Sequence, residues 1–398
     1  MTGSVLFYVQ HLLGIGHLRR AMLLTGAMTH AGLAVTLVTG GEPLPELAAV
    51  PARRVVQLAP IRASDASFKT LVGVDGEPPD DALWSARRSM LLAAFAEARP
   101  DAVVIEAYPF GRRPFRAELE PLVAAARARD PRALVVCSLR DIVVAPPHAR
   151  REREIVERVR ADFDAVLVHA DPRLIRLDAS FPLASEIADR LVYTGYVAAP
   201  EIPSAGGCNA GAGEVLVSAG GGAVGGALMR AALAARRRGC LADTGWRLLA
   251  GPNLPANEFS DLMAELPDGV TVERYRDDFP QLLRRCRVSV SQAGYNTVLD
   301  VIAAGVAAVL VPFAELRETE QTLRAERLAA SGVVEVLPAG ELAPDRLCEA
   351  IERAAARRRP AALRIDISGA RRSALTIAAM ISDRTNPNIL QKIQHAGG

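Results

Sequence analysis

A chain of 398 residues is too long for one ordinary hydrophobic core, so we expect two domains. The formal net charge is only +2, and this excludes a strong overall field that would attract nucleic acid. The five cysteines are far apart, odd in number and without CxxC spacing, which argues against a disulfide framework and a zinc site and favours a reducing cytoplasm. The first apolar run, residues 5–9, is too short for a signal peptide or a membrane span.

The first half of the chain alternates short apolar runs with helical stretches. Strands are predicted at residues 5–9, 34–41, 53–58, 102–107, 133–139, 165–170 and 190–196. Helices are predicted between several of them, at 18–31, 82–98, 114–129 and 148–160. This alternation predicts a parallel sheet with helices on both faces. We assign residues 1–196 to a first α/β domain.

Residues 197–213 have the composition of a linker, with small residues, Pro and Gly. The alternation then restarts, with strands predicted at 214–222, 246–251, 270–275, 288–294, 307–313 and 333–338. Residues 214–368 therefore form a second α/β domain of similar size. A terminal helix over 369–383 and a flexible tail over 384–398 complete the expected organisation.

Each half opens with a strand, a glycine turn and a helix. In the first turn, GIGHLRR (14–20), His17 and Arg20 stand where a dinucleotide-binding fingerprint would continue to its third glycine. The second turn, SAGGGAVGG (218–226), is suited to phosphate oxygens, because exposed backbone N–H groups and a helix N-terminus meet there. The alternative for these glycines is a tight turn that only needs positive φ.

The stretch 291–321 carries polar residues at two further strand ends. Gly294 ends a strand, and Asn296 or Thr297 is expected to cap the next helix. Asp300 then falls in the first helical turns, where a carboxylate can accept hydrogen bonds from a ribose diol.

Thr319, Glu320 and Gln321 begin another predicted helix. Adjacent carboxylate and amide side chains at such a junction suit several sugar hydroxyls. The alternative is local: Thr319 caps the helix, while Glu320 favours the helix dipole and pairs with Arg324.

The motif SQAGYNTVLDVIAAGVAAVLVPF, followed by ETEQTLRAERLAASG, resembles the C-terminal half of the MurG-like glycosyltransferases. GIGHLRR is similar to their N-terminal G-x-G-H turn, and SAGGGAVGG to the glycine loop of their second domain. The resemblance spans most of residues 1–383 and is strongest over 286–332. It implies an α/β GT-B fold, in which two Rossmann-like parallel-sheet domains face a cleft. IEAYPFGRRPF and CSLRDI indicate a branch of predicted transferases within this group.

The resemblance implies a UDP-sugar donor, for example one like UDP-GlcNAc, held mainly by the second domain. Its diphosphate would contact Gly220, Gly221 and Gly222, and uracil would be read by the backbone around Arg276. Asp300 matches the ribose-binding carboxylate, which is more often Glu in the family. Glu320 and Gln321 match the residues that grip the donor sugar. The remaining donor-side residues are Gly294 and Asn296.

The resemblance further implies inverting, metal-independent transfer with no cofactor beyond the nucleotide sugar. His17 is the candidate base, because a helix N-terminus and the neighbouring arginines should lower its pKa and leave it neutral at pH 7. The alternatives are that His17 positions an acceptor phosphate or only bonds backbone. Glu106 and Asp141 are further catalytic candidates at strand ends; the alternative for a strand-end carboxylate beside an arginine is a plain ion pair. Acceptor-side candidates are Gly16, Arg20 and Arg140.

The acceptor is expected to be a small molecule or lipid-linked, with no nucleic acid involved. Residues 87–99, RRSMLLAAFAEAR, are interpreted as helix core, with peripheral docking at the inner face of the membrane as the alternative. His11 is interpreted as a core residue. Three other functions stay open: a nucleotide-sugar 2-epimerase, an NAD(P)-dependent oxidoreductase and a non-catalytic nucleotide-sugar sensor.

Overall fold

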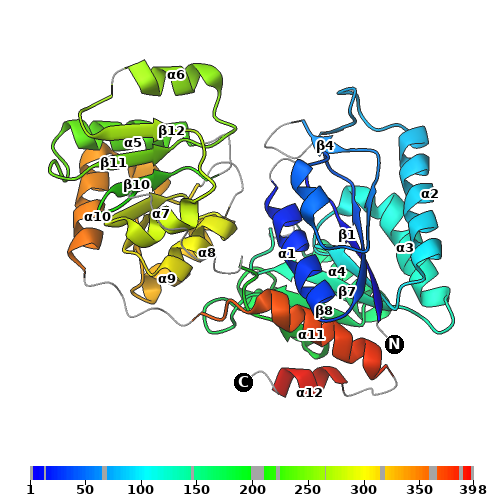
Figure 1. The fold of residues 1–398 in the computed structure, drawn as a ribbon. Helices are drawn as coiled ribbons and strands as arrows, with labels where there is room; N and C mark the ends of the chain where they lie inside the picture. The colour runs from blue at the N-terminus through cyan, green and yellow to red at the C-terminus, as the bar shows by residue number, and fades with distance from the viewer. Residues whose placement is uncertain are drawn as a thin grey trace. The chain divides into compact units, whose positions relative to one another are not determined.

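The computed structural model divides the chain into two compact units (Figure 1), one formed by residues 1–199 and 366–398 and the other by residues 200–365. The structure describes residues 3–12, 15–64, 70–144, 148–198, 210–220, 225–264, 266–313, 319–357, 365–384 and 389–395. Among these residues, no helix has both the length and the apolar character needed to cross a membrane.

The first unit contains a seven-stranded parallel sheet of order β3-β2-β1-β6-β7-β8-β9. Its strands are β1 (Ser4–Val9), β2 (Ala34–Thr39), β3 (Arg54–Gln57), β6 (Ala102–Glu106), β7 (Leu134–Arg140), β8 (Ala165–His169) and β9 (Leu191–Tyr193). A separate antiparallel pair joins β4 (Arg62–Ala63) to β5 (Leu71–Val72). The central strands β1, β6 and β7 are almost wholly buried, as expected for a parallel sheet covered on both faces, whereas the edge strand β3 is partly exposed.

Helices cover both faces of this sheet. They are α1 (Gly16–His30), α2 (Asp81–Ala98), α3 (Arg116–Ala128), α4 (Ala149–Asp162), α11 (Gly369–Ser382) and α12 (Ile389–His395). Figure 1 shows α11, in red, beside α1, in blue, and both helices pack on the face to which Phe7 points. The neighbouring residue Tyr8 points to the opposite face, where it meets Glu118 of α3.

The second unit contains a six-stranded parallel sheet of order β12-β11-β10-β13-β14-β15. Its strands are β10 (Val215–Ser218), β11 (Trp246–Leu249), β12 (Val270–Glu273), β13 (Val288–Ser291), β14 (Ala308–Leu310) and β15 (Glu335–Val336). Its helices are α5 (Gly226–Arg237), α6 (Ala256–Ala264), α7 (Phe279–Arg285), α8 (Tyr295–Ala304), α9 (Glu320–Ala330) and α10 (Pro344–Ala356). The apolar sides of α5 and α10 pack with alternate residues of β10, β11, β13 and β14 in one core.

Short 3₁₀ helices complete the described structure: η1 (Pro45–Ala49), η2 (Arg113–Phe115), η3 (Leu177–Ala179), η4 (Pro182–Arg190) and η5 (Ala339–Glu341). The return of the chain to the first unit begins at Asp366, slightly before the end of the second domain expected from sequence. The Tyr196 N–H donates to the Asp366 carbonyl at 2.7 Å, which ties this crossing to the end of the first sheet.

The segment expected to be a flexible tail contains α12, whose Leu390 and Ile393 pack against the first core. One expectation from sequence is wrong in the structure. Cys240 and Cys348, 108 residues apart, form a disulfide. Their spacing along the chain gave no sign of it, because only the packing of α5 and α10 brings the two cysteines together.

Candidate functional site

The first unit places His17 and Glu106 at the same edge of its sheet. β1 is the strand at which the order reverses, with β2 on one side and β6 on the other. Tyr8 of β1 pairs with Ile105 of β6, so the loop after β1 and the end of β6 are neighbours. Ligands of open parallel sheets bind at this kind of switch point, outside the carboxyl ends of the strands.

His17 and Arg20, both on α1, converge on the Glu106 carboxylate. His17 Nδ1 and Arg20 Nη2 each lie 2.5 Å from Glu106 Oε1. The Glu106 side chain is 1% exposed, whereas the His17 side chain is 26% exposed. The imidazole is thus anchored on its buried side and remains accessible to solvent.

Arg112 is a member of this cluster that the sequence argument missed. It lies in the loop after β6, where Ala107 and Arg112 both have positive φ, at 63° and 58°. Its Nη2 lies 3.5 Å from Glu106 Oε2, and its buried Nε has no hydrogen-bond partner among the described residues. The only signal in the sequence was an arginine close behind a strand-end carboxylate.

These contacts determine how the cluster is protonated. Burial is the main cause that lowers the pKa of His17 to about 4, with Arg112 and Arg20 adding to the decrease and Glu106 opposing it. Burial alone would raise the pKa of Glu106, but His17, Arg112 and Arg20 bring it well below its usual range. Glu106 is therefore ionised at pH 7 and His17 is neutral. The short contact then places the ring proton on Nδ1 and leaves Nε2 as an acceptor.

The expected lowering of the His17 pKa is confirmed, but its cause differs from the one we expected. The sequence argument relied on the helix N-terminus with Arg19 and Arg20. In the structure, burial dominates, and Arg112 contributes more than Arg20. Arg19 is exposed.

The other candidates of the first unit lie nearby in the fold. Asp141, just after β7, is fully buried and accepts hydrogen bonds from the Ile142 N–H at 2.9 Å and the Tyr196 hydroxyl at 3.5 Å. Arg140 ends β7 and donates from Nε to the Ile142 carbonyl at 3.0 Å. Gly16 is the first residue of α1. His11 is buried, and burial lowers its pKa, in keeping with a core residue.

The second unit repeats this arrangement around β10, which lies between β11 and β13. Gly220 follows β10 with φ of +66°, so this turn does require a glycine. A Cβ at Gly220 would lie 3.5 Å from Thr297 Oγ1, which places the glycine turn beside the first turn of α8. Gly221 and Gly222 lie outside the described residues.

Helix α8 begins differently from the prediction. Its N-cap is Gly294, without a side-chain hydrogen bond, and Asn296 and Thr297 lie inside its first turn. The prediction that Asn296 or Thr297 caps the helix is therefore wrong. Asp300 is half-buried in the second turn of α8.

At the start of α9, the pairing proposed as the local alternative is present. Glu320 Oε1 accepts from Arg324 Nη2 at 2.7 Å, and Arg324 Nη1 also donates to the Ala293 carbonyl at 3.0 Å. Arg324 is 1% exposed, so it ties α9 to the loop after β13. Thr319 is the N-cap residue but makes no side-chain capping bond. Gln321 Oε1 accepts from the Phe313 N–H at 3.1 Å.

Arg276 lies beyond the end of β12, where its side chain is held by two acids. Its Nε and Nη2 bond the two carboxylate oxygens of Asp278 at 2.7 and 2.8 Å, and Nη1 lies 3.2 Å from Glu273 Oε1. The bonds to Asp278 are the main cause that raises the pKa of Arg276. The backbone around Arg276 is the segment that we expected from the resemblance to bind uracil.

The segment 87–99 lies in α2, with its first arginine buried. Arg87 is 0% exposed and pairs with the equally buried Glu118 of α3. Leu91, Ala94 and Phe95 are buried on the same helix. This face of α2 is therefore core, while Met90 is exposed.

Comparison with known families identifies the second half of the chain. Residues 215–374 match the glycosyltransferase family 28 C-terminal domain. The Gly220 turn, α8 and α9 all lie within the residues that match this domain.

Two curated relatives carry the name UDP-N-acetylglucosamine--N-acetylmuramyl-(pentapeptide) pyrophosphoryl-undecaprenol N-acetylglucosamine transferase. The protein from Methylibium petroleiphilum is 39% identical over 84 residues, which are 21% of this chain and 23% of that protein. The protein from Exiguobacterium sibiricum is 27% identical over 119 residues, 29% of this chain and 32% of that protein. The matches thus span between about a quarter and a third of the relatives' length. Together with the family 28 domain, they confirm the resemblance to MurG-like proteins.

Solved structures are similar over nearly the whole chain. The glycotransferase of kitacinnamycin aligns with a TM-score of 0.62 at 18% identity, covering 99% of this chain and all of that one. CalG4, the calicheamicin glycosyltransferase, aligns with a TM-score of 0.61 at 20% identity, covering 97% and 98%. Acinetobacter baumannii MurG aligns with a TM-score of 0.58 at 16% identity, covering 96% and 99%. The prediction of a GT-B fold with two parallel-sheet α/β domains is confirmed.

Proposed function

We propose that this protein is a glycosyltransferase that moves a sugar from a nucleotide-sugar donor to an acceptor hydroxyl. The family 28 domain supports a donor site in the second unit. The observation that carries the chemistry is the His17–Glu106 pair, a neutral imidazole hydrogen-bonded through Nδ1 to a buried, ionised carboxylate. Such a pair orients the ring and stabilises the imidazolium that forms on proton uptake.

In the proposed reaction, the acceptor hydroxyl loses its proton to His17 Nε2 while its oxygen attacks the anomeric carbon of the donor. The bond from that carbon to the diphosphate breaks, and its electron pair leaves with the nucleoside diphosphate. One attack from the face opposite the leaving group inverts the anomeric centre. Backbone N–H groups near Gly220 and the start of α8 would stabilise the developing negative charge.

The donor is proposed to be a UDP-sugar, because the curated relatives are named for a UDP-sugar substrate. Asp300 would bind the ribose, and the segment around Arg276 would bind the base. Glu320, whose Oε1 accepts from Arg324 Nη2, would bind the donor sugar. No resident metal or cofactor is part of the proposal.

The acceptor is proposed to be a small molecule or a lipid-linked one. Arg20 and Arg112 place two guanidinium groups beside His17, and guanidinium groups favour an acceptor with an anionic group. A lipid-linked acceptor would bring the protein to the inner face of a membrane as a peripheral protein.

The donor is tested by thermal shift with a panel of nucleotide sugars, in which a UDP-sugar should raise the melting temperature by mass action. The reaction is then tested by nucleoside diphosphate release with candidate acceptors. His17→Ala should abolish release and keep UDP stabilisation, whereas His30→Ala, at the exposed far end of α1, should change neither.

Two results would contradict the proposal. Conversion of the UDP-sugar to its epimer without any acceptor would identify a 2-epimerase. Stabilisation by NAD(P) and by no nucleotide sugar would remove the donor site.

A further inference from the structure

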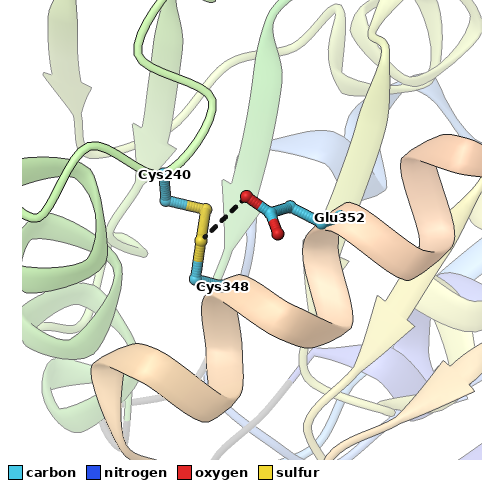
Figure 2. Close-up of side chains that lie close together, drawn as sticks. All are labelled: Cys240, Cys348 and Glu352. Atoms are coloured by element: carbon cyan, nitrogen blue, oxygen red, sulfur yellow. Dashed lines mark hydrogen bonds between the residues drawn. A yellow bond between two sulfur atoms is a disulfide. The ribbon is translucent and has the colours of Figure 1, made fainter.

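The Cys240–Cys348 disulfide links helix α10 to the turn that follows helix α5 in the second unit. Cys240 follows the C-terminal end of α5, and Cys348 lies in the second turn of α10 (Figure 2). Their Cα atoms are 5.6 Å apart, within the usual range for a disulfide. The bridge therefore joins α10 to the C-terminal end of α5, the helix whose N-terminal end follows the glycine turn at Gly220.

The helices around this bridge also hold each other without it. Arg238 Nη1 pairs with Asp345 Oδ1 at 2.6 Å beside the bridge. The buried residues Leu347 and Ile351 of α10 share one core with α5. Opening the S–S bond would therefore leave the two sulfurs as neighbours, which favours closure of the bond again.

The two sulfurs differ in access. Cys240 is 2% exposed, whereas Cys348 is only partly buried and lies one helical turn before the exposed Glu352. An external thiolate would therefore attack Cys348 and expel Cys240, because attack needs an approach along the S–S bond.

Glu352 places a carboxylate next to the accessible sulfur. Its Oε1 lies 3.6 Å from Cys348 Sγ. Figure 2 marks this contact with a dashed line. A negative charge at this distance repels an approaching thiolate. This repulsion slows thiol–disulfide exchange.

We propose that Cys240 and Cys348 form a reversible thiol–disulfide site for low-molecular-weight thiols, with Glu352 slowing the exchange. A thiolate attacks Cys348 Sγ, the Cys240–Cys348 bond breaks, and its electron pair remains on Cys240 as a thiolate. A second thiolate attacks the small-molecule sulfur of the mixed disulfide and releases Cys348. Two small thiols thus become one small disulfide, and the protein gains two thiols with their two protons. Oxidation by the small disulfide is the reverse.

The redox state of this site sets the stability of the second unit. The bridge closes a loop of about a hundred residues, so its reduction should lower the melting temperature of this unit on the order of 5–15 °C. This inference does not depend on the proposed glycosyl transfer.

The same three residues could serve a metal ion instead. One ligand atom each of Cys240, Cys348 and Glu352 lies within 4.8 Å of the others. Two thiolates and a carboxylate suit zinc, but the disulfide uses both sulfurs. The disulfide and the metal site exclude each other, because the two sulfurs are bonded to each other in the first and are separate thiolate ligands in the second.

The test equilibrates the whole chain with glutathione buffers of increasing reducing strength, alkylates free thiols and locates the label by peptide mass spectrometry. We expect Cys240 and Cys348 to become labelled together as the buffer becomes more reducing, and to be protected again after reoxidation. The buried Cys137 and Cys286 should stay unlabelled in the folded protein and serve as internal controls.

Two variants on α10 test the part played by Glu352. Glu352→Gln should speed reduction by glutathione by about three- to tenfold, since it removes the charge beside the sulfur. Glu349→Gln removes a carboxylate from the same exposed helix surface, where it pairs with Arg346, and should leave the rate unchanged. Equal rates in Glu352→Gln and the wild type would overturn the role of Glu352.

The disulfide itself is tested by stability and by metal content. The melting temperature of the wild type should fall on reduction, and that of Cys240→Ser/Cys348→Ser should not respond to the redox buffer. If Cys240 and Cys348 remain free thiols in oxidising buffer, the proposal is wrong. It is also wrong if the purified protein holds one zinc per chain and both thiols become labelled only after chelation.

Discussion

Replacing Arg87 with Met tests whether the buried ion pair between α2 and α3 holds the first unit together. Arg87 donates from Nε to Glu118 Oε2 at 2.8 Å and from Nη2 to Glu118 Oε1 at 2.7 Å. It also bonds Gln10 Oε1 and the carbonyls of Gly40 and Ala59. Arg87 and Glu118 are both 0% exposed, so no water can replace these bonds.

Arg87→Met keeps most of the side-chain volume but removes both hydrogen bonds from Arg87 to the buried Glu118 carboxylate. Of the side-chain hydrogen bonds described for Glu118, the one from the Tyr8 hydroxyl, at 2.6 Å, remains. Breaking a buried ion pair from one side costs about 3–5 kcal/mol. For a unit of this size, each kcal/mol lowers the melting temperature by about 2–4 °C, so the expected fall is roughly 6–20 °C. Arg87→Met/Glu118→Gln should recover part of the loss, because no uncompensated charge remains.

The assay is thermal and urea unfolding followed by circular dichroism. The matched control is Arg54→Met, because Arg54 of β3 pairs with Glu97 of the same helix α2, but both side chains are exposed. Exposed pairs contribute little, so this variant should unfold like the wild type. A melting temperature for Arg87→Met equal to that of Arg54→Met would refute the reasoning, as would a double variant less stable than Arg87→Met.

Three further predictions concern the two sites. In ¹⁵N NMR, His17 should be neutral with its proton on Nδ1 down to pH about 4, and Glu106→Gln should lower its pKa further; a rise would contradict the pairing. Burial lowers the pKa of His169 to about 3, so as the pH falls His169 is protonated in the unfolded chain before it is protonated in the folded protein. The stability that is present above pH 6.5 should therefore be lost as the pH falls toward 3, by about 1.4 kcal/mol per pH unit. Urea titrations at pH 7 and 4.5 measure this loss, and His169→Gln should reduce it; an unchanged pH slope would exclude His169. Gly220→Ala, at φ of +66°, should cost about 1–2 kcal/mol and weaken stabilisation by UDP in a thermal-shift assay, and no change in either would remove the turn from the donor site.

The sequence by itself determined the α/β class, the two sheets and the residues at their strand ends. Apolar runs of β-forming residues separated by helical stretches leave few arrangements other than covered parallel sheets, which is why β1 and β10 lie where periodicity placed them. Placing His17 and Gly220 after strands was also possible from sequence, because a glycine turn that follows such a run is a local feature. The candidate residues were therefore found through position along the chain.

Only the tertiary structure decided which of these residues meet. His17 and Glu106 are 89 residues apart and become neighbours because β1 pairs with β6. The burial of Arg87 and the pairing of Cys240 with Cys348 depend in the same way on how helices pack against one another in the folded chain. Local spacing carries no information about such contacts. The sequence around a strand-end carboxylate, an arginine or a cysteine is the same whichever strands lie next to each other in the sheet. The protonation of His17 also follows from burial, which the completed fold alone produces.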